Sequence, residues 1–109
     1  MCLVTAKCIV MLTAGERLRW ARSLVSSLSA RELSRLAGQS ETHVGQIEDG
    51  RVTNPGAYTV AALCEVMALS IDWVIHGGGA PPEPEAVRRA VAIARADAAA
   101  KALAESEPA

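Results

Sequence analysis

Residues 28–50 read LSARELSRLAGQSETHVGQIEDG, and the helix signals in this stretch decide the fold. Ser29 with Glu32 three residues later is a capping box, which predicts the start of a short helix. Gly38 is suited to end that helix in a left-handed conformation. The small Ser34, four residues before this glycine, allows a second helix to cross the first closely. The residues expected on the inner face are Leu33, Leu36 and Ala37.

A second helix is expected over about residues 40–49. Ser40 is its candidate N-cap, and Gly50 can end it in a left-handed conformation. Val44 and Ile47 are one helical turn apart and are expected to face the core. Since only three residues separate the two helices, the stretch predicts a helix-turn-helix.

Three more helices are expected around this pair. Thr13 and Glu16 form another capping box, Asn54 and Pro55 are a cap followed by a first helical residue, and Ser70 caps a brief helix over residues 71–76. The inward positions are Leu18, Ala21 and Leu24 or Val25 in the first, Val60, Leu63, Cys64 and Met67 in the second, and Trp73 and Val74 in the third. All five helices are short, which predicts one small helical domain.

Composition divides the chain into three parts. Residues 1–12 are an apolar lead, either a short strand or an extra segment ahead of a second start at Met11. The helical domain is expected over residues 13–78, because glycines and prolines from 77 to 84 then form a linker. Residues 79–109 comprise this linker and an Ala-rich tail that favours helix by propensity. We expect the core to come from the central part.

The tail shows only a thin apolar stripe along its expected helix. The stripe consists of Val87, Val91, Ala94 and Ala98. A helix with so narrow an apolar face needs a partner surface or stays partly frayed. The alternative is a solvated single helix stabilised by pairs such as Asp97 with Lys101.

Size, charge and hydropathy exclude several classes of protein. A chain of 109 residues with a net charge of -1 is too short for two catalytic lobes and is no histone-like polycation. The apolar run at residues 8–12 is too short to span a bilayer, and Lys7 interrupts the apolar stretch that a signal peptide needs. Three cysteines, an odd number, fit reduced thiols in packing roles. We therefore expect a cytoplasmic protein without a membrane segment.

Four stretches in order carry a family resemblance. They are GERLRWAR at residues 15–22, LSARELSRLAG at 28–38, VGQIEDG at 44–50 and ALSIDWVI at 68–75. Together they resemble the phage-repressor and Cro-type helix-turn-helix regulators, also called the xenobiotic-response-element type, from about Leu12 to Gly78. The resemblance implies an all-α, five-helix repressor-like domain, to which the composition of the tail adds an appended Ala-rich C-terminal helix.

In proteins of this kind the third helix enters the major groove of DNA. The family's base-reading positions correspond here to Ser40, Glu41, Thr42 and Gln46, and Gly45 also lies on the outward face. Gln46 can pair with adenine, Thr42 can contact a thymine methyl group, and Glu41 can accept from the cytosine amino group. Gly45 allows a close approach of the helix backbone to DNA. The alternative is a solvated polar face with no ligand.

Candidate phosphate contacts are Arg19, Arg31, Arg51 and His43. Arg31 near a helix N-terminus and Arg51 just past the reading helix are the better placed, whereas a solvated surface role is at least as plausible for Arg19 and for Arg35. His43 can donate to a phosphate, although a lone histidine on a surface helix more often has no functional role.

Other residues limit the affinity for DNA. The resemblance implies a buried ion pair between Arg22 and Glu48, which we therefore exclude from DNA contact. Ala30 replaces a glutamine that often anchors a phosphate, Asp49 stands where Asn or a basic residue is common, and Gly56 stands where some relatives carry arginine. Six arginines oppose seven acidic residues over positions 13–78, so non-specific affinity should be modest and salt-sensitive.

The function expected is that of a sequence-specific regulator, a repressor of the small phage or bacterial kind, that binds a near-palindromic operator in double-stranded DNA as a homodimer. Three surfaces could form the dimer: the helix at 71–76, the Ala-rich tail and edge pairing of residues 3–10. We favour the tail or the lead. The alternative is an antitoxin-like or adaptor module whose tail binds a protein partner and whose DNA binding is secondary.

Catalytic and metal chemistry are not expected. No Cys/His pair has metal-ligand spacing, and the glycines at 77–79 follow a helix, which indicates a linker and not a phosphate loop. Glu48 and Asp49 are adjacent on a helix, so their carboxylates diverge and cannot act as an acid/base pair. We expect no enzyme activity and no cofactor.

Overall fold

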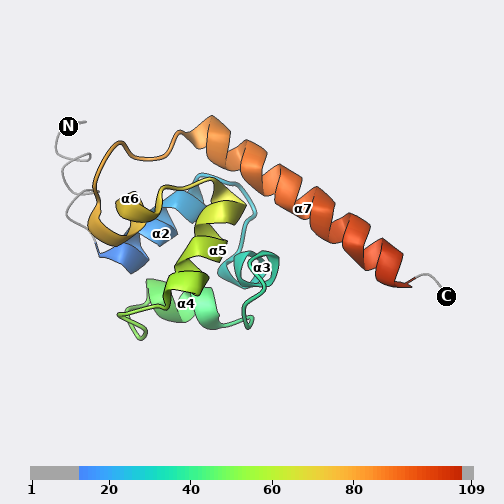
Figure 1. Ribbon diagram of the computed structural model, residues 1–109, viewed down its shortest axis with the longest axis horizontal. Helices are drawn as coiled ribbons and strands as arrows, with labels where there is room; N and C mark the ends of the chain where they lie inside the picture. The colour runs from blue at the N-terminus through green and yellow to red at the C-terminus, as the bar shows by residue number, and fades with distance from the viewer. Residues whose placement is uncertain (1–12, 107–109) are drawn as a thin grey trace.

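The computed structural model describes residues 13–106, which fold into six helices with no strand among them (Figure 1). The helices are α2 (Ala14–Ser23), α3 (Ala30–Leu36), α4 (His43–Glu48), α5 (Ala57–Met67), α6 (Ile71–His76) and α7 (Pro84–Ser106). The prediction of an all-α chain is confirmed. The alternatives for residues 1–12, including edge pairing at 3–10, lie outside the described residues. None of the six helices has the length and hydropathy that a bilayer span requires.

Local capping signals placed three helix starts correctly. At α2 the Thr13 hydroxyl accepts from the Glu16 N–H (3.2 Å), and the Glu16 carboxylate accepts from the Thr13 N–H (3.3 Å), so the capping box is complete. The Ser29 hydroxyl accepts from the Glu32 N–H (3.0 Å) at α3, and the Ser70 hydroxyl caps α6 in the same way. Gly38 and Gly50 both have positive φ angles, as expected of residues that follow a helix.

The start of α4 differs from the prediction. The helix begins at His43 and not near Ser40, and a turn over residues 37–42 separates it from α3. Ser40 contributes its carbonyl oxygen, which accepts from the His43 N–H (3.0 Å), and makes no side-chain cap. Its candidacy as N-cap was wrong because a hydroxyl from α3 caps this helix.

The start of α5 also lies later than expected. Gly56 occupies the N-cap position and the helix begins at Ala57, so the pair Asn54–Pro55 does not open it. Pro55 is instead partly buried in the preceding loop, where it lines a small apolar gap beside Leu18.

All six helices contribute to the core, and every predicted inward position except Leu24, Leu36 and Ala37 is buried in it. Those three residues are partly buried against the same cluster. Trp73 is 1% exposed, and its ring lies 5.9 Å from that of Trp20 at 56°. A Cβ at Gly15 would collide with the carbonyl oxygen of Ile47, so this glycine sets how closely α2 and α4 approach.

The Ala-rich tail belongs partly to the same core. Val87 and Val91 on α7 are fully buried in the cluster, which corrects the expectation that the core ends before residue 78. The apolar stripe of α7 therefore finds its partner surface on the helical domain of the same chain. Ala98, the last residue of the stripe, is exposed, and Figure 1 shows α7 continuing past α3 toward the C-terminus.

Two arginines tie α7 to the domain. Arg88 donates to the carbonyl oxygen of Leu24 (3.0 Å), and Arg95 makes two 2.7 Å hydrogen bonds to the carboxylate of Glu32. The pair of Asp97 with Lys101, named for the alternative of a solvated single helix, forms no salt bridge. The first half of α7 is therefore anchored, and its second half is exposed.

Candidate nucleic-acid interface

Helix α4 is held in place by contacts on its buried side. Val44 and Ile47 are 0% and 3% exposed, as their spacing predicts. The buried hydroxyl of Ser34 accepts from the Val44 N–H (3.1 Å) and donates to the carbonyl oxygen of Ala30 (2.9 Å). Because Thr42 makes no side-chain cap, this hydroxyl satisfies an N–H that helix geometry leaves without a partner. The orientation of α4 is thereby fixed against α3.

The C-terminal end of α4 is fixed by the ion pair that the resemblance implied. Arg22 donates to both carboxylate oxygens of Glu48 (2.8 and 2.9 Å) and also to the carbonyl oxygen of Leu28 (2.9 Å). The Glu48 side chain is 1% exposed. Hydrogen bonding to this carboxylate raises the pKa of Arg22. Both residues hold the fold together, and neither is available to an external ligand.

The five predicted base-reading residues occupy one continuous edge. Ser40, Glu41 and Thr42 are exposed in the turn before α4, and Gly45 and Gln46 are partly exposed on α4 itself. The side chain of Gln46 makes no hydrogen bond to any part of the chain that the structure describes. Its carbonyl oxygen accepts from the N–H groups of the two following loop residues, 51 and 52. The Gln46 amide is therefore free to bind a ligand.

Gly45 is a glycine that the fold itself does not require. It lies inside α4 without a positive φ, and a Cβ built on it meets no atom within 4 Å. Glycine inside a helix costs about 1 kcal/mol relative to alanine. No contact inside the described residues offsets that cost.

Two of the predicted phosphate-binding cations are already paired. Arg31 bonds to the carboxylate of Glu41 (2.9 Å), and Arg19 bonds to that of Asp49 (2.8 Å). Sequence spacing gave no sign of either pair, since the partners lie ten and thirty residues apart. These side chains are about half exposed or more, so each pair is weak. A phosphate can therefore compete with the carboxylates for both arginines.

The remaining predicted cations are unengaged. Arg51 is exposed just after α4 and forms no ion pair within residues 13–106, and the same holds for Arg35 on α3. His43 is partly exposed at the first position of α4. Arg51 is thus the best placed of the four predicted phosphate contacts.

Sequence reasoning missed Tyr58. This residue, the chain's single tyrosine, is 93% exposed in the first turn of α5. Its neighbour Thr59 donates to the Gln39 side chain (3.4 Å), so the first turn of α5 lies beside the turn between α3 and α4. The available signal was a lone aromatic residue two positions after Gly56, the N-cap of α5.

Arg17 is a second residue whose role was missed. It is 4% exposed and donates to the carbonyl oxygens of Val74 (2.9 Å) and Ile75 (2.9 Å) near the end of α6. A cation is favourable at the C-terminal end of a helix. Burial lowers the pKa of Arg17, and its role is to attach α6 to α2.

The described part of the chain contains neither a metal-binding cluster nor a reactive thiol. Residues 13–106 contain no group of three or more His, Cys, Asp or Glu side chains placed to hold a metal ion. Cys64 is buried and unpaired, and desolvation raises the pKa of its thiol to about 11. That thiol is protonated at neutral pH and unreactive. Cys2 and Cys8 lie outside the described residues.

Comparison with known proteins identifies no relative. No family model matches the chain, and searches of curated proteins and of solved structures give no significant match.

Proposed function

We propose that this protein is a sequence-specific DNA-binding transcriptional regulator, a repressor that binds a near-palindromic operator as a homodimer. In this proposal α3 and α4 are a repressor-like helix-turn-helix, and α4 with the turn before it reads bases in the major groove. One observation carries the proposal. Helix α4 is fixed by Ser34, by Glu48 and by two buried apolar residues, while on its other side the Gln46 side chain makes no hydrogen bond and Gly45 makes no packing contact within residues 13–106.

The exposed edge supplies suitable groups for reading DNA. The free amide of Gln46 can make a bidentate pair with adenine, and Thr42 can contact a thymine methyl group. The absence of a side chain at Gly45 would bring the backbone of α4 close to the floor of the groove. Glu41 can read cytosine only after it leaves Arg31, which couples one base contact to one phosphate contact.

Electrostatics make the affinity strongly dependent on the operator. Arg51 is free to bind phosphate, whereas Arg19 and Arg31 must exchange carboxylates for phosphates. Each arginine–phosphate contact replaces an arginine–carboxylate contact, so its net contribution to the binding free energy is small. Non-specific binding is therefore weak, and it falls as salt increases. One short helix contacts few base pairs, and a two-fold dimer doubles the contacts on a palindromic site.

Selection from a random pool of duplexes tests this function. We expect an enriched inverted repeat, whose binding, measured by fluorescence anisotropy at two salt concentrations, is weakened at least about tenfold by Gln46→Ala. Glu83→Ala, at an exposed position before α7, is the control and should bind like the unaltered protein. Absence of enrichment at low salt would refute DNA binding by the chain alone.

An antitoxin-like or adaptor module is the second candidate. The observation that favours it is that Arg19 and Arg31 are neutralised by Asp49 and Glu41 in the free protein. A stable complex with another protein that requires residues 83–105, together with no shift of any DNA, would support this function over the first.

A further inference from the structure

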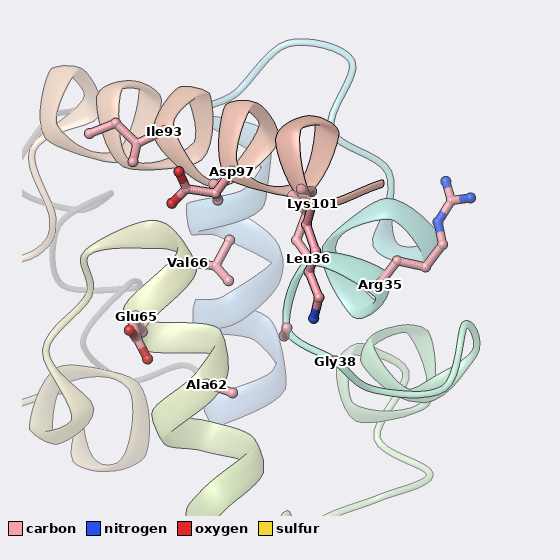
Figure 2. A pocket seen from close by; sticks show the side chains of 12 residues that line it. Arg35, Leu36, Gly38, Ala62, Glu65, Val66, Ile93, Asp97 and Lys101 are labelled. Atoms are coloured by element: carbon pink, nitrogen blue, oxygen red, sulfur yellow. The ribbon is translucent and has the colours of Figure 1, made fainter. Parts of the chain in front are cut away.

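A groove of about 520 Å³ lies between α3, α5 and the exposed half of α7 (Figure 2). Its apolar surface includes Leu36 from α3, Val66 from α5 and Ile93 from α7. Figure 2 shows Asp97 and Lys101 on the α7 wall, with Lys101 reaching down beside Leu36. The groove therefore has an apolar floor and one charge of each sign on its α7 wall, and Arg35 from α3 and Glu65 from α5 line its other sides.

The wall itself is an unpartnered helix. Beyond Arg95, α7 carries only three charged residues before it ends at Ser106, and the rest are mainly alanine. Ile93, which lines the groove, is 58% exposed. Together with Leu36 and Val66 it gives the groove an apolar surface that another protein could cover.

The charges on the wall indicate what covers it. Asp97 and Lys101 are one helical turn apart, and neither forms a salt bridge or hydrogen bond with any described residue. Suppose a second α7 lies antiparallel to the first, about a two-fold axis midway between these positions. Asp97 of each copy then faces Lys101 of the other, and two ion pairs form. The charge pattern is thus complementary to itself, and the many alanines allow the two helices to approach closely.

We infer that the occupant of this groove is α7 of a second copy of the chain, docked antiparallel along the α7 wall. This interface rests on the proposed function only in that operator binding calls for a homodimer, and it is testable without DNA. It uses the exposed half of α7, because the first half is already packed into the core through Val87 and Val91.

Charge reversal tests the inference by sedimentation equilibrium at low salt without DNA. Asp97→Lys places two lysines opposite each other, and Lys101→Asp places two aspartates opposite each other, at both symmetric contacts. Each single variant should therefore weaken dimerisation about tenfold or more, since each exposed pair changes from attraction to repulsion. The double variant restores the complementarity and should dimerise like the unaltered chain. Arg89→Asp, an exposed charge reversal earlier on α7, is the control.

Mixing the two single variants gives the sharpest result. In a mixed dimer both contacts join a lysine to an aspartate, so an equimolar mixture should dimerise although neither variant does alone. An unaltered chain that stays monomeric, single variants that dimerise normally, or a mixture that stays monomeric would each overturn the inference.

The outcome is separable from that of the DNA experiment. A dimer that follows the charge rules but selects no operator refutes the proposed function and leaves the interface standing. Operator binding by a dimer that ignores these substitutions refutes the interface and leaves the function standing.

Discussion

The hydroxyl of Ser34 on α3 accepts a hydrogen bond from the backbone N–H of Val44 on α4 (3.1 Å), and both residues are fully buried. The cap of α4 is therefore supplied by the neighbouring helix and not by a residue at its own N-terminus. This contact joins α3 to the helix whose outer face is proposed to read DNA, and it acts together with the buried Val44 and Ile47 to hold that helix in place.

Ser34→Ala should lower the free energy of unfolding by about 1–3 kcal/mol, because it leaves a buried N–H without an acceptor. The measurement is urea unfolding followed by tryptophan fluorescence. Ser26→Ala, at an exposed loop position, is the control and should change stability by less than about 0.5 kcal/mol. Equal effects of the two substitutions would show that the Ser34 contact has no energetic role.

Sequence signals predicted what depends on a few neighbouring residues. Thr13, Ser29 and Ser70 were recognised as caps because each bonds to an N–H three residues later in the chain. Ser40 was misassigned as a cap because the competing hydroxyl, that of Ser34, comes from another helix. The rule used for capping contains no information about such a tertiary competitor.

Contacts between distant residues were beyond prediction for the same reason. Periodicity identified Val87 and Val91 as a stripe, but it could not say that their partner surface is the domain itself. The pairing of Arg31 with Glu41 depends on the path of the turn between α3 and α4. The sequence placed Glu41 inside the second helix, whereas in the structure α4 begins at His43 and Glu41 belongs to the turn. The pair of Arg22 and Glu48 was expected only from the family resemblance.

Removal of the Glu48 carboxylate should be among the most damaging single changes. Glu48→Ala leaves the partly buried Arg22 without its counter-ion, so we expect a loss of about 3 kcal/mol in unfolding free energy. Adding Arg22→Ala in the same chain should recover part of this loss, because the unpaired charge is then gone. A double-mutant cycle measured by urea unfolding checks both values, and strictly additive losses would contradict the pairing.

Gly45→Ala should have opposite effects on stability and on DNA binding. A Cβ at this position meets no atom of the chain, so the helix gains about 1 kcal/mol from the better helix former. If the backbone of α4 approaches the bases closely, the added methyl group weakens binding to the selected operator. Thermal unfolding and anisotropy on one preparation measure both effects, and tighter or unchanged binding would argue against the close approach.

Val91→Ala tests whether α7 is part of the core. Val91 is fully buried, and the loss of two methyl groups together with the resulting cavity should cost about 2 kcal/mol. Leu103→Ala removes more apolar volume from the same helix at a position that is 66% exposed, and it should cost less than about 0.5 kcal/mol in the monomer. Unfolding at protein concentrations below the dimer range makes the comparison, and equal costs would mean that α7 does not pack as described.

Acid should loosen the attachment of α7 through Glu32. The Arg95 guanidinium donates two hydrogen bonds to this carboxylate and holds its pKa below the usual range. A carboxylate whose folded pKa is lowered adds stability above its unfolded pKa of about 4.3, and that contribution is lost as the pH falls through the lower folded pKa. The stability difference between the unaltered chain and Glu32→Gln should therefore be constant at neutral pH and shrink toward zero in acid. Urea unfolding at a series of pH values measures it, with Glu105→Gln as an exposed control. A difference that does not change with pH would show that the carboxylate charge of Glu32 does not anchor α7.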